Sequence, residues 1–189
     1  YVNLLGLCYT VIAMTLQDWI KQSSQMLTKH GSNSANLDSQ LLACLVLGLS
    51  RTWLHAHPET ELSAKQVEQL QQLFKRRAGG EPMAYIIGSK EFYGRKFVVN
   101  SSVLVPRPES EDFIDIVKNL PADLEFIDIG TGSGILAITT ALEQPRWSGT
   151  ATDVSPKALA VAKQNAHKLG VKNLVFRNQN LLVNDAENY

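Results

Sequence analysis

One stretch limits the possible folds more than any other: a short apolar segment runs into a glycine-rich sequence and then into a helical pattern. Residues 128–134 read Asp-Ile-Gly-Thr-Gly-Ser-Gly, and Phe126, Ile127 and Ile129 make the preceding segment apolar. Glycine accepts positive φ angles and lets a ligand approach the backbone closely. A helix that follows such a loop offers free backbone N–H groups to an anion. The sequence therefore predicts a strand buried on both faces, a ligand-binding loop and a helix over 133–142.

The pattern after Leu124 continues to alternate between strands and helices. A second strand ends at 150–152, Ser155 and Pro156 begin a helix that Gly170 ends, and 174–176 form a third strand. This alternation indicates an α/β fold with a parallel, doubly wound sheet. We expect the sheet to be cut off at Tyr189, because such folds use about five strands or more.

The loop and the next strand together indicate a nucleoside-bearing cofactor. Asp153 follows the second strand, where a carboxylate accepts hydrogen bonds from ribose hydroxyls. A dinucleotide fingerprint requires a third glycine where this chain has Ile135. Asp128, just before the loop, suits the ammonium group of S-adenosylmethionine, and the loop N–H groups suit its carboxylate. The pattern favours a methyltransferase over a dehydrogenase, and a tight turn without a ligand is the remaining alternative.

Residues 15–80 carry the pattern of a small helical bundle. Thr15 with Asp18, and Ser63 with Gln66, form helix starts of the capping-box type. Apolar spacing predicts further helices over 37–49, which we expect to be buried on most sides, and over 51–57. Cys44 is interpreted as a small core residue, and the two histidines beside Trp53, His55 and His57, as surface or packing residues.

The residue composition changes after Pro82, where β-branched and aromatic residues predict strands or hairpins that join two domains. These residues are Tyr85, Ile86, Ile87, Phe92, Tyr93, Phe97, Val98, Val99, Val103, Leu104 and Val105, with a turn at 100–102. Ser110 is expected to begin a helix whose apolar face carries Phe113, Ile116, Val117 and Leu120. We therefore expect a helical domain over 14–80, a β-hairpin linker over 81–107 and a partial cofactor-binding domain over 108–189.

Composition excludes several classes of protein. The chain has 18 basic and 18 acidic residues and 44% hydrophobic residues, which argues against disorder and against nucleic-acid binding by bulk charge. Two cysteines cannot form a disulfide framework or a metal cage, which fits the cytoplasm. The apolar stretch 1–14 is too short to span a membrane and lacks the pattern of a secretory signal. We expect translation to begin at Met14, with an additional N-terminal helix as the alternative.

Four stretches resemble the release-factor glutamine N5-methyltransferase family. They read RRAGGEPMAYIIGSKEFYGRKFVV, VLVPRPESE, DIGTGSGILA and TDVSPKALAVAKQNA. The resemblance runs from Met14 to about residue 183. It implies a helical substrate-recognition domain, a β-hairpin linker and a Rossmann-like methyltransferase domain that uses S-adenosyl-L-methionine. The reaction that it implies is methylation of the glutamine side-chain amide in the Gly-Gly-Gln loop of peptide-chain release factors.

Cofactor contacts are expected at the residues that match the family's motifs. They are Asp128, Gly130, Thr131, Gly132, Ser133, Gly134, Asp153, Asn180 and Leu181. Phe92 and Arg107 are expected to order the cofactor site, and no metal ion is implied. Ser110 stands where the family usually has Thr, and Asn180 where it usually has Asp. The family's Asn-Pro-Pro-Tyr motif, which grips the acceptor amide, should follow Asn180 but is not in the sequence, so we expect the chain to be inactive alone.

The expected partner is a release factor, bound by a monomer without membrane association. Residues 75–107 carry seven basic residues against two acidic ones: Lys75, Arg76, Arg77, Lys90, Arg95, Lys96 and Arg107 against Glu81 and Glu91. They form either a basic face for the release factor or nearby RNA, or solvated surface, which we favour. Two other functions stay open: an adenine or cytosine N-methyltransferase that acts on nucleic acid, and a non-catalytic fragment that binds cofactor or partner.

Overall fold

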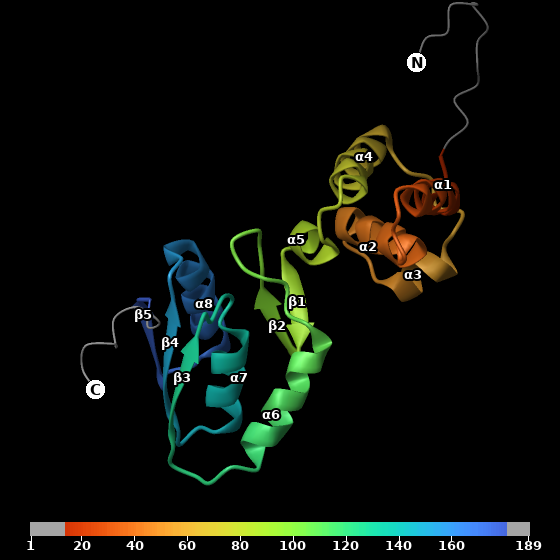
Figure 1. Cartoon of the computed structure of the whole chain (residues 1–189). Coiled ribbons are helices and arrows are strands. Elements are labelled where there is room, and N and C mark those ends of the chain that lie inside the picture. Colours follow the sequence, from red (N-terminus) through yellow and green to blue (C-terminus); the bar gives the residue numbers. More distant parts are fainter. Residues whose placement is uncertain (1–13, 181–189) are drawn as a thin grey trace, which may run out of the picture. The chain divides into compact units, whose positions relative to one another are not determined.

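The computed structural model describes residues 14–180, and the chain divides between Ile87 and Gly88 into two compact units (Figure 1). The expectations for the start of the protein and for Leu181 fall outside the described residues. The predicted fold class is confirmed, since a helical bundle precedes a hairpin and a parallel sheet with helices. The three-part division expected from the sequence stays a prediction.

The first unit consists of helices. They are α1 (Leu16–Lys29), α2 (Ala35–Leu47), α3 (Arg51–Ala56), α4 (Ala64–Ala78) and the short α5 (Met83–Ile87). Both predicted helix starts are confirmed: the Thr15 hydroxyl oxygen accepts the N–H of Asp18 at 3.2 Å, and Ser63 and Gln66 form a complete capping box. Fully buried leucines of α1, α2 and α4 form the centre of the bundle, namely Leu16, Leu42 and Leu70.

The expected burial of helix α2 on most sides agrees with the structure: within Ala35–Leu47 only Asn36, Leu37 and Leu45 are exposed, the two leucines by 40% and 42%. The expectation of a strand at 85–87 is wrong. Residues 85–87 form part of α5 and not a strand. The Pro82 carbonyl accepts the N–H groups of Tyr85 and Ile86, at 3.0 and 3.2 Å, and this turn overrides the β propensity of the isoleucines.

The predictions for the cysteine and the histidines agree with the structure. Cys44 packs against the bundle core, and burial raises the pKa of its thiol. The ring of His57 stacks on Trp53, with 4.3 Å between ring centroids. Within residues 14–180, no group of three or more His, Cys, Asp or Glu side chains could hold a metal ion.

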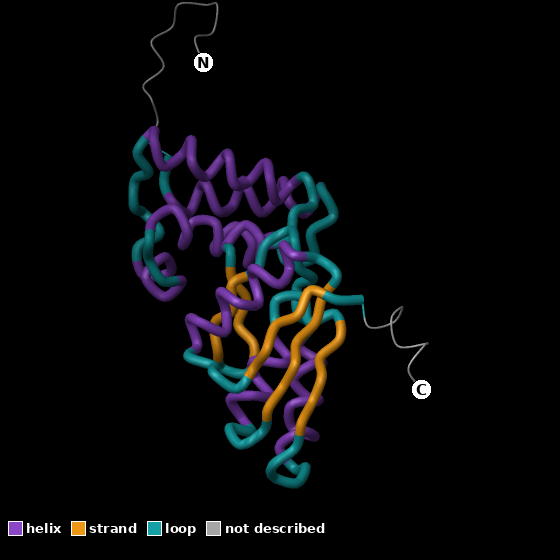
Figure 2. The backbone as a smooth tube through the Cα atoms, turned by 90° about the vertical axis from the view of Figure 1, so that its left-hand side faces the viewer, coloured by secondary structure: helices purple, strands orange, loops and turns teal. Residues whose placement is uncertain are grey.

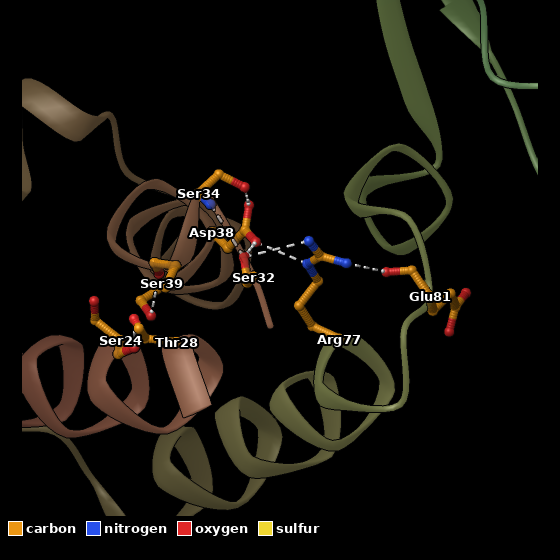
Figure 3. Close-up of polar contacts among 9 residues, drawn as sticks. Ser24, Thr28, Ser32, Ser34, Asp38, Ser39, Arg77 and Glu81 are labelled. Carbon is orange, nitrogen blue, oxygen red and sulfur yellow. Dashed lines mark hydrogen bonds and ion pairs between the residues drawn. The ribbon is translucent and has the colours of Figure 1, made fainter. Parts of the chain in front are cut away.

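A buried carboxylate ties the start of α2 to the end of α4 (Figure 3). The Asp38 side chain is only 4% exposed and accepts hydrogen bonds from the Ser32 and Ser34 hydroxyls, at 2.8 and 3.0 Å. Nε of Arg77 donates to the same carboxylate at 2.8 Å, and a second guanidinium nitrogen donates to the Glu81 carbonyl. This arginine therefore stabilises the bundle. Two other basic residues of the 75–107 stretch also form ion pairs, Arg76 with Glu81 in the first unit and Arg95 with Glu143 in the second.

The second unit begins with an antiparallel hairpin, β1 (Ser89–Phe92) and β2 (Arg95–Val98). Its two-residue turn, Tyr93-Gly94, has φ angles of +49° and +69°, as a primed hairpin turn requires. The predicted turn at 100–102 is confirmed by a bond from the Val103 N–H to the Asn100 carbonyl at 3.1 Å. The residues from Val99 to Val105 lie outside the strands, contrary to prediction.

A 3-10 turn, Pro108–Ser110, leads into α6 (Glu111–Lys118). The helix begins where expected, but its predicted apolar face is wrong. Ile114 and Val117 are buried, whereas Phe113, Ile116 and Leu120 are 50%, 62% and 44% exposed. The buried positions are three residues apart, so they form one narrow stripe and the other apolar side chains fall outside it.

The sheet of the second unit is parallel, as predicted, with the order β3 (Glu125–Ile129), β4 (Ser148–Asp153) and β5 (Leu174–Asn178). Helices α7 (Ile135–Glu143) and α8 (Pro156–Leu169) connect these strands and lie on one face of the sheet (Figure 2). Right-handed connections between strands added in one direction place both helices on the same side.

Among the described residues the sheet is therefore not doubly wound, and β3 is not buried on both faces. Ile127 and Ile129 are 52% and 53% exposed, on the face that α7 and α8 leave free. No helix within residues 14–180 is long and apolar enough to cross a membrane.

The buried ion pair of the first unit generates a stability prediction. Arg77→Ala should lower the free energy of unfolding by about 3 kcal/mol, because it leaves the Asp38 carboxylate buried without its cation. Urea denaturation followed by circular dichroism measures this change. Arg76→Ala is the matched control, since its exposed pair with Glu81 should contribute little. Equal losses in the two variants would contradict the role assigned to the buried pair.

Candidate functional site

The loop between β3 and α7 lies at the carboxyl end of the sheet and is pinned to the neighbouring strand. The N–H groups of Gly130 and Thr131 both donate to the Thr152 carbonyl at the end of β4, each at 2.9 Å. The Gly134 N–H donates to the Thr131 carbonyl at 2.8 Å, and Gly134 is the N-cap of α7. The predicted strand, loop and helix thus meet at one edge, with the first turn of α7 directly behind the loop.

The three glycines of the loop have positive φ angles of +75°, +56° and +77° but different surroundings. A Cβ atom at Gly130 would meet nothing within 4 Å, so space is open beside this part of the backbone. A Cβ atom at Gly134 would lie 2.8 Å from the side chain of Ile138 and 3.0 Å from that of Ala162. Gly134 therefore permits close packing of α7 against α8, and the open approach to the backbone lies at the start of the loop.

Asp153 braces the loop from the end of β4. Its Oδ2 accepts the N–H of Gly132 at 2.9 Å, and its Oδ1 accepts the N–H of Ser155 at 2.8 Å. A carboxylate oxygen can accept two hydrogen bonds. Each oxygen therefore keeps capacity for one donor of a ligand, such as a hydroxyl group.

Asp128 braces the loop from the other side. The Thr131 hydroxyl donates to Oδ2 of Asp128 at 2.7 Å. Burial raises the pKa of Asp128 above its ordinary value, and the nearby Asp153 raises it further, while the Thr131 hydroxyl and the Ala137 N–H act in the opposite direction. The fold thus holds a carboxylate whose ionised form is poorly solvated, and a cationic ligand group would stabilise it.

The structure brings most of the other predicted residues to the same edge or beneath it. Thr131 and Ser133 are buried within the loop, and Asn180 follows β5 at its carboxyl end. Phe92 is 1% exposed and packs in the core that includes Ile135 of α7. Arg107 is exposed and directly precedes the 3-10 turn, where its carbonyl accepts the Ser110 N–H at 3.1 Å. The roles of these residues in cofactor binding stay predictions.

Sequence reasoning missed three residues that support the loop. Thr152 supplies the carbonyl that receives two loop N–H groups, and Asn178 donates from its side chain to the Asp153 carbonyl at 2.8 Å. Asn165 of α8 donates to the Ser133 carbonyl at 2.9 Å. A signal for Asn165 exists in the sequence, because it is a polar residue on the apolar stripe that includes Ala162 and Ala166, where a buried amide requires partners.

Each of the two units contains a match to a known domain family. Residues 18–88 match the PrmC N-terminal domain, and residues 120–186 match a methyltransferase domain. The release factor glutamine methyltransferase of Coxiella burnetii is 43% identical over 166 residues, which cover 86% of this chain and 60% of that protein. The corresponding proteins of Koribacter versatilis and Vibrio cholerae are 41% and 35% identical, over 89% and 87% of this chain and 61% and 58% of their own lengths.

The fold, the loop and the two domain matches define a protein of the methyltransferase class. More narrowly, the chain belongs to the release factor glutamine methyltransferase family. It spans about 60% of the length of these relatives.

The raised pKa of Asp128 predicts a stability gain on neutralisation. Because the folded state binds this proton more readily than the unfolded state, the free energy of unfolding falls as pH rises from the unfolded to the folded pKa. Asp128→Asn should therefore stabilise the chain at pH 7, and the gain over the native chain should shrink as the pH is lowered through the pKa of Asp128.

Urea denaturation at a series of pH values measures this difference. Asp153→Asn is the control, because it removes a charge from the same pair but leaves one acceptor oxygen for two backbone N–H groups, and it should not stabilise. A loss of stability in Asp128→Asn at pH 7 would show that burial does not dominate at this carboxylate.

Proposed function

We propose that this chain forms the substrate-recognition and cofactor-binding parts of an S-adenosylmethionine-dependent protein glutamine methyltransferase that acts on peptide-chain release factors. The observation that carries the proposal is the loop 130–134 held between two carboxylates at the carboxyl edge of a parallel sheet. The names of the relatives support the substrate.

The residues present fit this cofactor. Asp153 would receive the ribose hydroxyls on the acceptor positions that its two backbone bonds leave free. Asp128 would stabilise the ammonium group of the methionine part, and the loop would offer its backbone to the carboxylate beside the open space at Gly130. Asn180, beyond β5, has both a donor and an acceptor for the adenine.

Positioning has to supply most of the catalysis in this reaction. When bound, the cofactor supplies a methyl group activated by a sulfonium. An amide nitrogen is a poor nucleophile, because its lone pair is delocalised into the carbonyl, so the acceptor amide must be held in line with the methyl group. The resemblance assigns this task to an Asn-Pro-Pro-Tyr motif, and these four residues do not occur in succession anywhere in the 189-residue sequence. We therefore expect this chain to bind the cofactor without transferring its methyl group.

The remaining parts of the proposal concern partners and compartment. The helices of the first unit would recognise the release factor, and the match of residues 18–88 to the PrmC N-terminal domain supports this role. The chain would act as a monomer in the cytoplasm, where release factors work. Net charge of zero argues against direct nucleic-acid binding.

Calorimetric titration with S-adenosylmethionine tests the cofactor assignment. Asp153→Ala should weaken binding by about 1–3 kcal/mol, because the ribose loses charge-assisted hydrogen bonds. Asp123→Ala is the control, since this carboxylate pairs with Arg146 before β3, at the opposite end of the strand from the loop. Unchanged affinity in Asp153→Ala would remove the ribose assignment.

Transfer of labelled methyl from S-adenosylmethionine tests the reaction, with the Coxiella burnetii relative as positive control. We expect no label on a purified release factor incubated with the 189-residue chain, because the Asn-Pro-Pro-Tyr run that the resemblance assigns to the acceptor amide is not among these residues. Turnover above background would contradict this claim. Label on DNA or RNA instead of the release factor would favour a nucleic-acid methyltransferase.

A further inference from the structure

Asn165 lies in α8 with no exposed surface and uses its whole side-chain amide. Its Oδ1 accepts the N–H of Val98 at 2.7 Å. Its Nδ2 donates to the Val98 carbonyl at 3.0 Å and to the Ser133 carbonyl at 2.9 Å. One side chain therefore joins the last residue of β2 to the glycine loop.

The two bonds to Val98 extend the hairpin onto the body of the unit. Val98 is opposite Ser89 in the hairpin, and its own N–H and carbonyl point to the amide of Asn165. An amide that bonds both backbone groups of one residue occupies the place of a neighbouring strand. Strand β2 is thereby fixed to α8.

The turn of the same hairpin is fixed to α6 by separate contacts. The N–H of Tyr93 donates to the Glu111 carboxylate at 2.8 Å, and its hydroxyl donates to Asp115 at 2.7 Å. The Lys118 ammonium donates to the Tyr93 hydroxyl at 3.0 Å. The turn of the hairpin is thus held by α6 and the end of β2 by Asn165. A shift of the hairpin would therefore displace Asn165 and, with it, the loop.

We infer that Asn165 is a positioning residue that couples the hairpin to the loop 130–134 and so maintains the loop conformation that receives the cofactor. The inference rests on the proposed function for its effect on cofactor affinity. The physical reason is that Ser133 is buried, and within residues 14–180 its carbonyl loses the side-chain amide that donates to it when Asn165 is changed. A buried carbonyl without a donor is costly, and the loop can recover a partner only by moving.

Asn173 provides a matched control in the same unit. Its Nδ2 also donates to two backbone carbonyls, those of Ala141 and Trp147, at 3.2 and 2.8 Å. It directly precedes β5 and so lies at the end of the sheet opposite the loop. Replacing either asparagine by aspartate removes the side-chain N–H donors. Only Asn165→Asp should affect the loop, because only Asn165 donates to it.

The first measurement is the affinity for S-adenosylmethionine, by calorimetry of the full 189-residue chain at a temperature where circular dichroism shows each variant folded. Asn165→Asp should weaken binding about tenfold or more, the scale of losing a residue that orients a binding group. Asn173→Asp should leave affinity unchanged. If Asn165→Asp does not fold, Asn165→Ser keeps one hydroxyl donor and should show a smaller loss in the same direction.

The second measurement is amide hydrogen exchange, which needs no cofactor. Gly130, Thr131 and Gly134 donate to backbone carbonyls and not to Asn165, so their exchange accelerates only if the loop itself loosens. We expect faster exchange at these amides in the Asn165 variants and native exchange in Asn173→Asp.

The outcomes separate the two claims. If the native chain does not bind S-adenosylmethionine, the proposed function fails, and the exchange data alone decide whether Asn165 couples hairpin and loop. Native exchange of the loop amides in Asn165→Asp would overturn the coupling. Equal losses of affinity in Asn165→Asp and Asn173→Asp would overturn the positioning role, because they would reflect general stability.

Discussion

The attachment of the glycine loop to the end of β4 is the interaction on which the rest of the site depends. Two loop N–H groups share the Thr152 carbonyl, and a third, that of Gly132, donates to the Asp153 carboxylate. These bonds exist only because β3 and β4 are parallel and in a register that places Ile129 beside Thr152. The loop, both carboxylates and the first turn of α7 are consequently fixed to one edge of the sheet.

This arrangement disfavours the ionised form of Asp128, a cost that a cationic ligand would offset. Burial raises the pKa of Asp128, and the nearby charge of Asp153 raises it further. A fold selected only for stability would place a neutral residue there, whereas a site for a cationic ligand group benefits from an under-solvated carboxylate. The same edge offers hydrogen-bond acceptors on Asp153, so one small region combines the features that a nucleoside with a charged side chain requires.

Local sequence patterns predicted the elements well where the determining interactions are short-range. The helix starts at Thr15 and Ser63 depend on side chains three residues away, and the turn at 100–102 depends on one bond between Val103 and Asn100. The errors occur where burial is decided by distant partners. The exposed faces of β3 and α6, with Ile127 and Phe113, follow from which side α7 occupies, and hydrophobic periodicity alone does not contain that information.

The sequence by itself determined the order of strands and helices, the loop at 130–134 and the two carboxylates that flank it, because glycine spacing and strand ends are local properties of the chain. Only the tertiary structure decided which groups support that loop. Asn165 and Thr152 reach it from α8 and β4, and the sequence separates them from the loop by many residues. The place of Asn165 on an apolar stripe marks it as a buried amide, but its partners are backbone carbonyls and N–H groups, which every residue has, so no residue type in the sequence identifies those partners. The physical reason is that hydrogen bonds to the backbone are specified by the packing of the elements and not by the identity of the residue that receives them.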